Sequence, residues 1–213
     1  AFGGVFDQVG GGFSRYSVDE KWHIPHFEKM LYDNGLLVSL YSDAYLVTKK
    51  EVYKDVVVKT LEFIETEMTS EIGGFYSSID ASSKNYKGIL EEGAYYTWEV
   101  SELKTLLKDD FDLFSKFYNV NDYGYWDRDK YVLIRSEALN TFAKQHNLSY
   151  REMRQKYKEW NAALLEHRNK RNKPRLDDKI LTSWNSIMMK AYLDAYRVLG
   201  ESQYLLAAKR NAL

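Results

Sequence analysis

The sequence of 213 residues contains no cysteine and only two prolines. Without cysteine, the chain can form no disulfide, no zinc–thiolate site and no thiol nucleophile. No apolar run reaches the roughly 20 residues that a membrane-spanning helix needs. A basic segment followed by an apolar one, which would mark a signal peptide, is also missing from the first residues. We therefore expect a soluble protein of the cytoplasm with no membrane partner.

An excess of charge of one sign is missing as well. The 30 Lys and Arg residues nearly balance the 31 Asp and Glu residues, and the net charge is -1 at pH 7. Nucleic-acid binding needs a concentrated basic face, so no such partner is expected. The one basic cluster, Arg168 to Arg175, is followed by two aspartates and is interpreted as a solvated helix end.

No cofactor or metal site is predicted either. The four histidines, at positions 23, 26, 146 and 167, do not have the spacing of a zinc-binding helix. The run Gly10-Gly11-Gly12 lacks the Lys and Ser or Thr of a phosphate-binding loop. The sequence also contains no Gly-x-Ser-x-Gly elbow of a serine hydrolase.

The chain is rich in aromatic residues, with 18 Tyr, 10 Phe and 5 Trp, which suit either a buried core or the wall of a polar groove. Apolar residues recur at helical spacing in most of the remaining sequence. Pro25 is placed at a helix start, where its missing N–H costs nothing, and Ser149 with Glu152 forms a capping box. We predict helices over 25–48, 51–68, 99–107, 111–118, 136–146, 149–171, 182–199 and 204–213.

Glycine-aromatic segments separate the helical pairs. Gly73-Gly74-Phe75 repeats the pattern of Gly11-Gly12-Phe13, and Tyr123 to Trp126 adds a third such segment. Residues 77–93 are expected to be a long polar loop, and 94–98 and 131–134 short β pieces. The unit of two helices and a Gly-aromatic loop recurs at roughly 50 to 60 residues, as in the hairpins of an α/α toroid. The predicted fold is mainly α: one incomplete α/α toroid domain over 1–213, a fragment of a longer chain.

Six runs of sequence resemble the signature of the spermatogenesis-associated protein 20 family, whose bacterial relatives are called thioredoxin-domain-containing proteins. They are Gly10–Phe13, Arg15–Asp19, Pro25–Asn34, Gly73–Ser77, Glu92–Trp98 and Asp177–Asn185. The resemblance implies the C-terminal six-hairpin glycosidase-like region of that family, similar to sugar 2-epimerases. It also implies a thioredoxin-like domain ahead of this region, which is absent here.

The sequence departs from the family pattern at three places. Ser14 stands where many members have His, Ser186 replaces a Gly, and Asp80 is the only acid left in a segment that is more acidic in the family. These losses favour a non-catalytic role for the positions concerned.

The first candidate for chemistry is the run after Pro25. His26, Lys29 and Asp33 are spaced i, i+3 and i+7, which puts them on one side of the predicted helix. A histidine near a carboxylate can act as general acid or base near neutral pH. The alternative is a histidine at a helix start beside two ordinary surface charges.

Asp177 and Asp178 form the second candidate. Glycoside hydrolysis needs two carboxyl groups about 5 to 9.5 Å apart. Adjacent residues rarely face one ligand, so one of them would pair with a distant acid such as Asp19, Asp33 or Asp80. The alternative is that the two acids stabilise the start of the helix near Thr182.

A third group suits sugar recognition, because a sugar site combines an aromatic platform with orienting polar groups. For Trp184 the alternative is packing in the core. The candidate substrate-binding residues are Arg15, Tyr16, Trp22, Asp80, Trp184 and Asn185.

The sequence thus predicts a toroid that binds or processes a saccharide, by glycoside hydrolysis or by epimerisation, with His26, Asp33, Asp177 and Asp178 as candidate catalytic residues. The two reactions remain open, and so does whether the chain is an enzyme. The alternative is a non-catalytic binding or scaffold domain for the thioredoxin-like partner domain. An exposed apolar seam on the last helix is expected to cause self-association or marginal stability.

Overall fold

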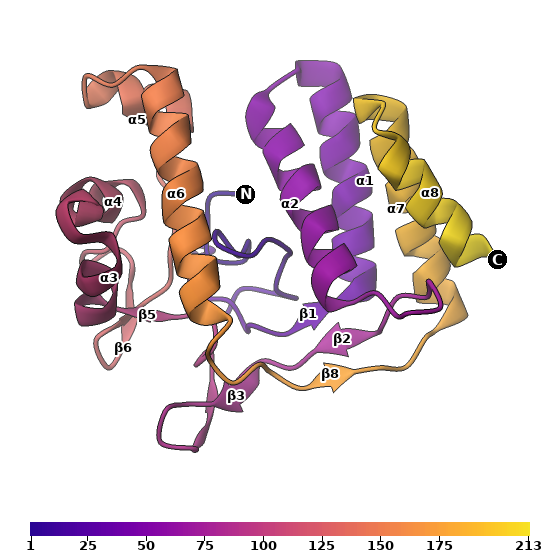
Figure 1. The fold of residues 1–213 in the computed structure, drawn as a ribbon, viewed down its shortest axis with the longest axis horizontal. Helices are drawn as coiled ribbons and strands as arrows, with labels where there is room; N and C mark the ends of the chain where they lie inside the picture. Colours follow the sequence, from indigo (N-terminus) through magenta and orange to yellow (C-terminus); the bar gives the residue numbers. More distant parts are fainter.

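The computed structural model describes residues 1–213, of which about half lie in helices (Figure 1). The helices are α1 (Leu31–Thr48), α2 (Glu51–Glu67), α3 (Val100–Leu107), η1 (Lys108–Asp110), α4 (Phe111–Phe117), α5 (Leu139–Gln145), α6 (Tyr150–Arg168), α7 (Thr182–Leu199) and α8 (Ser202–Ala212). The strands are β1 (Lys29–Met30), β2 (Ser78–Ile79), β3 (Ser82–Lys84), β4 (Leu90–Glu92), β5 (Trp98–Glu99), β6 (Tyr125–Asp127), β7 (Lys130–Tyr131) and β8 (Leu176–Asp177). The prediction of a mainly α protein is confirmed, and the arrangement is consistent with part of an α/α toroid.

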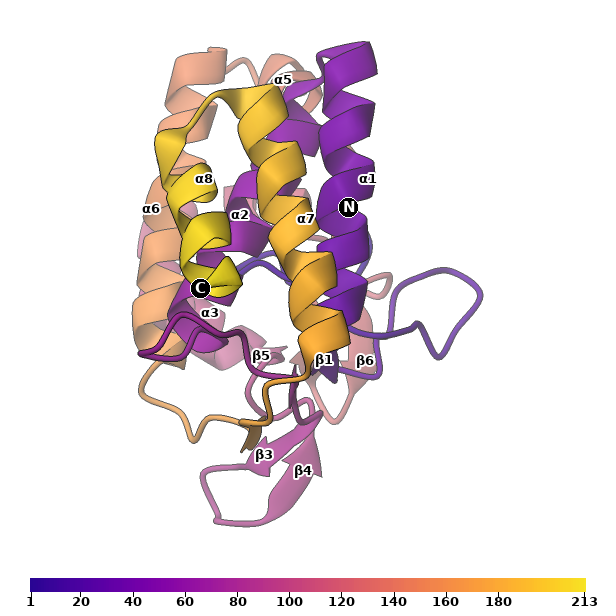
Figure 2. The same cartoon turned by 90° about the vertical axis from the view of Figure 1, so that its right-hand side faces the viewer.

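Two helical hairpins, α1/α2 and α7/α8, stand side by side and share one core (Figures 1 and 2). The hairpins turn at Lys49 and Gly200, both in the left-handed conformation with φ of 56° and 76°. Gly35 lets α1 approach α7 closely, since an added Cβ would lie 3.0 Å from Cγ2 of Ile187. The core between the hairpins contains Leu31, Val38, Leu61, Ile64, Met188, Ala191 and Tyr192.

An asparagine clamp joins each hairpin to its Gly-Gly-Phe loop. Oδ1 of Asn34 accepts the Phe13 N–H at 2.7 Å, and Nδ2 donates to the Phe13 carbonyl at 3.1 Å. Asn185 binds Phe75 in the same way, at 2.7 and 2.9 Å. Each asparagine is the fourth residue of its helix. Its Nδ2 also donates to the carbonyl of the residue that precedes the helix, Met30 for Asn34 and Leu181 for Asn185. The repeated Gly-Gly-Phe pattern of the sequence is therefore a repeated tertiary contact.

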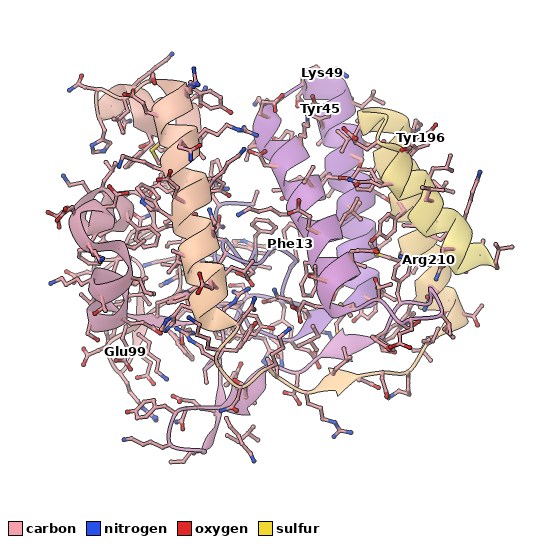
Figure 3. The ribbon with its side chains drawn as sticks, viewed as in Figure 1. Phe13, Tyr45, Lys49, Glu99, Tyr196 and Arg210 are labelled. Atoms are coloured by element: carbon pink, nitrogen blue, oxygen red, sulfur yellow. The ribbon has the colours of Figure 1, made fainter.

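The remaining helices, α3 to α6, pack on a second core. Phe114, Phe117 and Trp160 are fully buried there, and the Trp160 indole donates to Asp110 at 2.8 Å. The predicted capping box of α6 is present: Oγ of Ser149 accepts from the Glu152 N–H, and the Glu152 carboxylate accepts from the Ser149 N–H. Phe13 lies inside the molecule between the two groups of helices, whereas Lys49 and Arg210 mark outer ends (Figure 3).

A three-stranded antiparallel sheet, β1–β2–β8, crosses under the helix ends. Its registers align Lys29 with Ile79 and Leu176, and Met30 with Ser78 and Asp177. Since side chains alternate across a strand, Lys29 and Ile79 are buried under the helices, whereas Ser78 and Asp177 lie on the other face of the sheet. None of the helices in the structure is long and apolar enough to cross a lipid bilayer.

The predicted helix start at Pro25 is wrong, because α1 begins at Leu31. Residues 25–30 are not helical: Ser17 bridges Pro25, and the Arg15 N–H donates to the Glu28 carbonyl at 2.8 Å. Between them Phe27 is left-handed, with φ of 56°, and the Glu28 N–H donates to the His26 carbonyl at 2.7 Å. Burial alternates between successive residues from His23 to Lys29, which is the period of a strand. His26 and Lys29 therefore do not share a helix face with Asp33.

Three other predictions need correction. Residues 77–93 contain β2, β3 and β4 in place of a plain loop. The expected strands at 94–98 and 131–134 shrink to the two-residue strands β5 and β7, since residues 93–96 form a turn whose Tyr96 and Thr97 amides both donate to the Gly93 carbonyl. Arg168, assigned to a solvated helix end, has a side chain that is only 4% exposed.

Candidate functional site

The face of the β1–β2–β8 sheet that points away from the helices carries a hollow of about 350 Å³, which we call the acidic hollow. The residues that line it sit at alternate positions of the three strands and their extensions, so strand geometry brings them together. All of them are polar or charged: Glu28, Ser78, Asp80, Arg175, Asp177 and Lys179.

Ser77 holds the hollow against the start of α1. Its carbonyl accepts the Leu31 N–H at 2.9 Å, and its own N–H donates to the Asp177 carbonyl at 3.1 Å. Its hydroxyl donates to the Lys179 carbonyl at 2.6 Å. Asp80 is fixed in the same way, because its N–H donates to the Arg175 carbonyl at 2.9 Å. The backbone of two distant segments thus sets the spacing of the carboxylates.

Asp33, in the first turn of α1, does not line the hollow but is acted on by the charge of Glu28, which does. Its carboxyl is half-buried, and the Oδ2 atom is buried without a hydrogen-bond partner. Burial raises the pKa of Asp33; the nearby Arg15 guanidinium opposes that rise, and the Glu28 carboxylate adds to it. Arg15 is itself ion-paired with Glu28 at 3.2 Å. Asp33 therefore keeps its proton to higher pH than an ordinary aspartate does.

Asp177 shows the opposite behaviour. Nζ of Lys179 donates to its carboxylate at 2.6 Å, and this hydrogen bond is the main cause that lowers the pKa of Asp177. In acid–base sites, two carboxyl groups with pKa values shifted in opposite directions commonly divide the work, one as the acid and the other as the base or ionised carboxylate. Asp177 lines the hollow with Glu28, which also acts on Asp33.

Aromatic side chains flank this group. The ring of Trp184, at the start of α7, meets the edge of Tyr32 with centroids 4.8 Å apart. Trp184 is partly buried and also packs against the core between the hairpins, as its alternative interpretation expected. On the other side, Tyr16 stacks on His26 at 4.7 Å, and Nδ1 of His26 lies 3.0 Å from the Glu92 carboxylate.

Of the predicted site residues, only Asp80 and Asp177 line the hollow. Asp178 is exposed and makes no side-chain hydrogen bond or ion pair, because it points to the other side of the chain from Asp177. Trp22 is 64% exposed and lines a separate hollow with His23 and Tyr123. The Asn185 amide is fully used in its clamp, where it also accepts from Asn211 at 2.8 Å.

Sequence reasoning missed Glu28, Arg175 and Lys179, which line the acidic hollow. The missed signal was the alternation of polar residues at 26, 28 and 78, 80, which indicates strands rather than a helix and a loop. No group of three or more His, Asp or Glu side chains is arranged to hold a metal ion.

Comparison with known proteins gives relatives over the whole chain. The sequence is 34% identical to spermatogenesis-associated protein 20 of Homo sapiens and 33% identical to that of Mus musculus. It is also 34% identical to an uncharacterised protein of Caenorhabditis elegans. Each alignment covers 100% of this chain but only 30%, 29% and 32% of the respective relative. No family model matches the sequence.

Solved structures give looser similarities. A D-mannose isomerase aligns with 98% of this chain and 46% of its own, at 18% identity and a TM-score of 0.34. Cellobiose 2-epimerase from Bacillus thermoamylovorans aligns with 97% of this chain and 49% of its own, at 14% identity and a TM-score of 0.33. At such TM-scores the superposition decides neither the fold nor the reaction, and the chemistry of the hollow must be judged from its own residues.

Proposed function

The chain is homologous along its whole length to about a third of spermatogenesis-associated protein 20, and for this segment we propose a saccharide-binding, acid–base function at the acidic hollow. The observation that carries the proposal is Asp33. It combines a raised pKa with a buried, unpartnered oxygen and lies within the fields of Arg15 and Glu28. A carboxyl group that keeps its proton suits the protonation of a leaving oxygen.

The proposed roles follow from the neighbours of the hollow. Asp33 acts as the acid, and Asp177, held ionised by Lys179, acts as the carboxylate on the opposite side of the ligand. Asp80, Arg15 and Arg175 orient hydroxyl groups by hydrogen bonding. The Tyr32–Trp184 pair supplies an apolar face for a sugar ring.

Glycoside hydrolysis is favoured over epimerisation by the composition of the hollow. The carboxyl groups that line it, those of Glu28, Asp80 and Asp177, are of the kind that two-carboxylate hydrolysis requires, and no histidine lines it. His26, the histidine that epimerisation would use, is stacked on Tyr16, lies against Glu92 and does not line the hollow. For the remaining two thirds of the relatives' length, a thioredoxin-like partner domain stays the proposed neighbour.

The test is thermal unfolding of the intact protein with a panel of mono- and disaccharides. A ligand at 100 times its Kd stabilises the folded state by about 2.7 kcal/mol, which raises Tm measurably. We expect a hit that Asp33→Asn abolishes and Asp178→Asn leaves unchanged. The second variant is a matched control, because Asp178 is the exposed neighbour of Asp177 with no side-chain contact.

A panel with no shift in the folded protein would contradict the proposal and favour the non-catalytic scaffold. Given a hit, the products separate the two reactions: hydrolysis releases a new reducing end, and epimerisation inverts one carbon without cleaving the bond. Inversion without cleavage would overturn the assignment of hydrolysis while leaving the saccharide site intact.

A further inference from the structure

The opposite face of the β1–β2–β8 sheet borders a second and larger cavity, of about 640 Å³, between α2 and α6. In Figure 1 these helices stand apart on either side of the N-terminal loop. The floor is formed by Gly10, Lys29 and Arg168, and one wall by Tyr95 and Tyr96. We call it the α2/α6 pocket. It does not share a lining residue with the acidic hollow.

The floor of this pocket is a buried cluster of two cations and one carboxylate. The side chains of Lys29, Arg168 and Asp7 are 1%, 4% and 9% exposed. Nη1 of Arg168 donates to both Asp7 oxygens, at 3.0 and 2.8 Å, and Nζ of Lys29 donates to Oδ2 at 2.9 Å. Burial alone would raise the pKa of Asp7, but the charges of Arg168 and Lys29 outweigh it and hold the pKa far below its usual range. Asp7 is therefore ionised and is the one carboxylate that Arg168 and Lys29 share, while burial lowers the pKa of Lys29.

The guanidinium of Arg168 uses only one of its edges. Asp7 occupies Nη1, while the buried Nε has no hydrogen-bond partner and Nη2 donates no hydrogen bond within the chain. The Nε–Nη2 edge is the one that receives a planar carboxylate through two parallel hydrogen bonds. Buried donors are normally satisfied, so a buried edge without hydrogen-bond partners requires an explanation.

The fixed position of Arg168 shows that the cluster is a built site. A Cβ on Gly10 would lie 1.8 Å from Nη2, so glycine is required for the guanidinium to lie against the loop. The Arg168 guanidinium also lies 5.0 Å from the Tyr95 ring centre, and Lys29 lies 4.4 Å from that of Phe63. These contacts hold both cations at the pocket floor without neutralising them.

Further cations and donors surround the opening. Lys59 and Lys173 line the pocket with Glu62 and Glu67, and Lys173 is ion-paired with Glu67 at 2.6 Å. With the floor cluster included, four cations face three carboxylates. Burial raises the pKa of Tyr96, which keeps its hydroxyl protonated and able to donate.

From this geometry we propose that the α2/α6 pocket binds a small organic acid, whose carboxylate sits on the free edge of Arg168 beside Lys29 and whose apolar part lies against Tyr95, Tyr96 and Phe63. The volume suits a ligand of drug-like size. The proposal is independent of a saccharide in the acidic hollow.

The test is calorimetric titration of the intact protein with benzoate and succinate at constant ionic strength. Their neutral amides, benzamide and succinamide, serve as matched ligands, and inorganic phosphate serves as a tetrahedral anion. We expect the carboxylates to bind and the amides not to bind. No heat and no Tm shift with either carboxylate at about 10 mM, ten times a Kd of 1 mM, would overturn the proposal. Preference for phosphate over both carboxylates would overturn the assignment of the ligand class.

Two variants locate the binding. Arg168→Lys keeps the charge but removes the planar edge, and should weaken carboxylate binding at least about tenfold. If that variant does not fold, Thr66→Trp decides the question, because Thr66 is exposed on α2 at the pocket and a larger ring there blocks entry. Thr105→Trp is the matched control: Thr105 is also exposed, and its hydroxyl also donates to the carbonyl four residues earlier in its helix. Equal affinity in Thr66→Trp and the parent chain would place binding elsewhere and refute the site.

Discussion

At the scale of single residues, the molecule holds two aspartates, one buried and one half-buried, whose pKa values are shifted in opposite directions. Asp7 lies between Arg168 and Lys29 and is ionised, so its charge organises the floor of the α2/α6 pocket. Asp33 has an unpartnered oxygen, and burial raises its pKa. Neither state is visible in the sequence, because the charges that decide it come from positions up to 161 residues away.

The raised pKa of Asp33 predicts how the stability of the folded chain changes with pH. A carboxyl that binds its proton more tightly in the folded than in the unfolded chain contributes stability at low pH. That contribution is lost as pH rises from the unfolded value of about 3.9 through the folded pKa. Asp33→Asn imitates the protonated form, so its Tm relative to the parent chain should increase between pH 3 and pH 7.

The measurement is a series of melting curves over that range, with Asp178→Asn as the control. Asp178 is exposed and unpaired, so its replacement should give a curve parallel to the parent. Parallel curves for both variants would show that Asp33 titrates as an ordinary aspartate and would remove the main support for its role as an acid.

At the scale of elements, the asparagine clamps join helices to loops that are distant in sequence. Replacing Asn34 or Asn185 with Leu leaves the backbone N–H and carbonyl of Phe13 or Phe75 buried without partners. Each unsatisfied group costs about 1–3 kcal/mol, so either variant should lose about 2–5 kcal/mol of unfolding free energy.

Urea unfolding measures this loss, and Gln155→Leu is the control, because Gln155 is exposed and bonds only to Glu159 in its own helix. We expect less than about 0.5 kcal/mol for the control. A similarly small loss for both clamp variants would mean that water replaces the amide and that the clamps do not stabilise the fold.

The elements also show which parts of the structure the sequence could predict. The helices at 51–68, 149–171 and 182–199 were found because each has a long apolar stripe and its own start or stop signal. The start of α1 was placed six residues early, since Pro25 imitates a first helical turn and the strand that replaces it is stabilised by Ser17, Ser77 and Arg15. Pairing with distant segments, which local pattern does not contain, decides such short strands.

The candidate site divides in the same way. Arg15, Asp33, Asp80 and Asp177 were named from the sequence, and the structure gathers them around the start of α1. Asp178 and Trp22 were named for the same reasons but point elsewhere. Residue type and family resemblance suggested these positions, whereas the alternation of side chains along β1, β2 and β8 decides that Asp80 and Asp177 line the hollow.

At the scale of the whole molecule, apolar residues cover α1 on all sides. Val38 is buried against α7, yet Leu36, Leu40 and Val47, on the opposite face, are 56%, 61% and 82% exposed. A helix that is apolar around its full circumference is normally buried. The expected seam therefore lies mainly on α1, since Leu206 is the one large exposed apolar residue within α8 and Leu213 follows the end of that helix.

We expect this chain to self-associate through the exposed face of α1. Sedimentation velocity at increasing concentration should show dimers or larger species, and the double variant Leu36→Lys, Leu40→Lys should sediment as a monomer. Leu206→Lys, on α8, should leave the association unchanged. A monomeric parent chain at high concentration, or a loss of association only with Leu206→Lys, would contradict this prediction.

The asparagine clamp also fixes the position of the residue that precedes it in the helix. The residue just before the asparagine is Asp33 in α1 and Trp184 in α7, the third residue of each helix. Hydrogen bonds to the Gly-Gly-Phe loop fix the position of each helix start along its axis. Because α1 and α7 are parallel neighbours that start at the same end (Figure 2), these two side chains stand at one level. Any further hairpin with the same clamp would add one more side chain at that level. The residue directly before each clamp asparagine would then decide the chemistry of the surface that such hairpins form together.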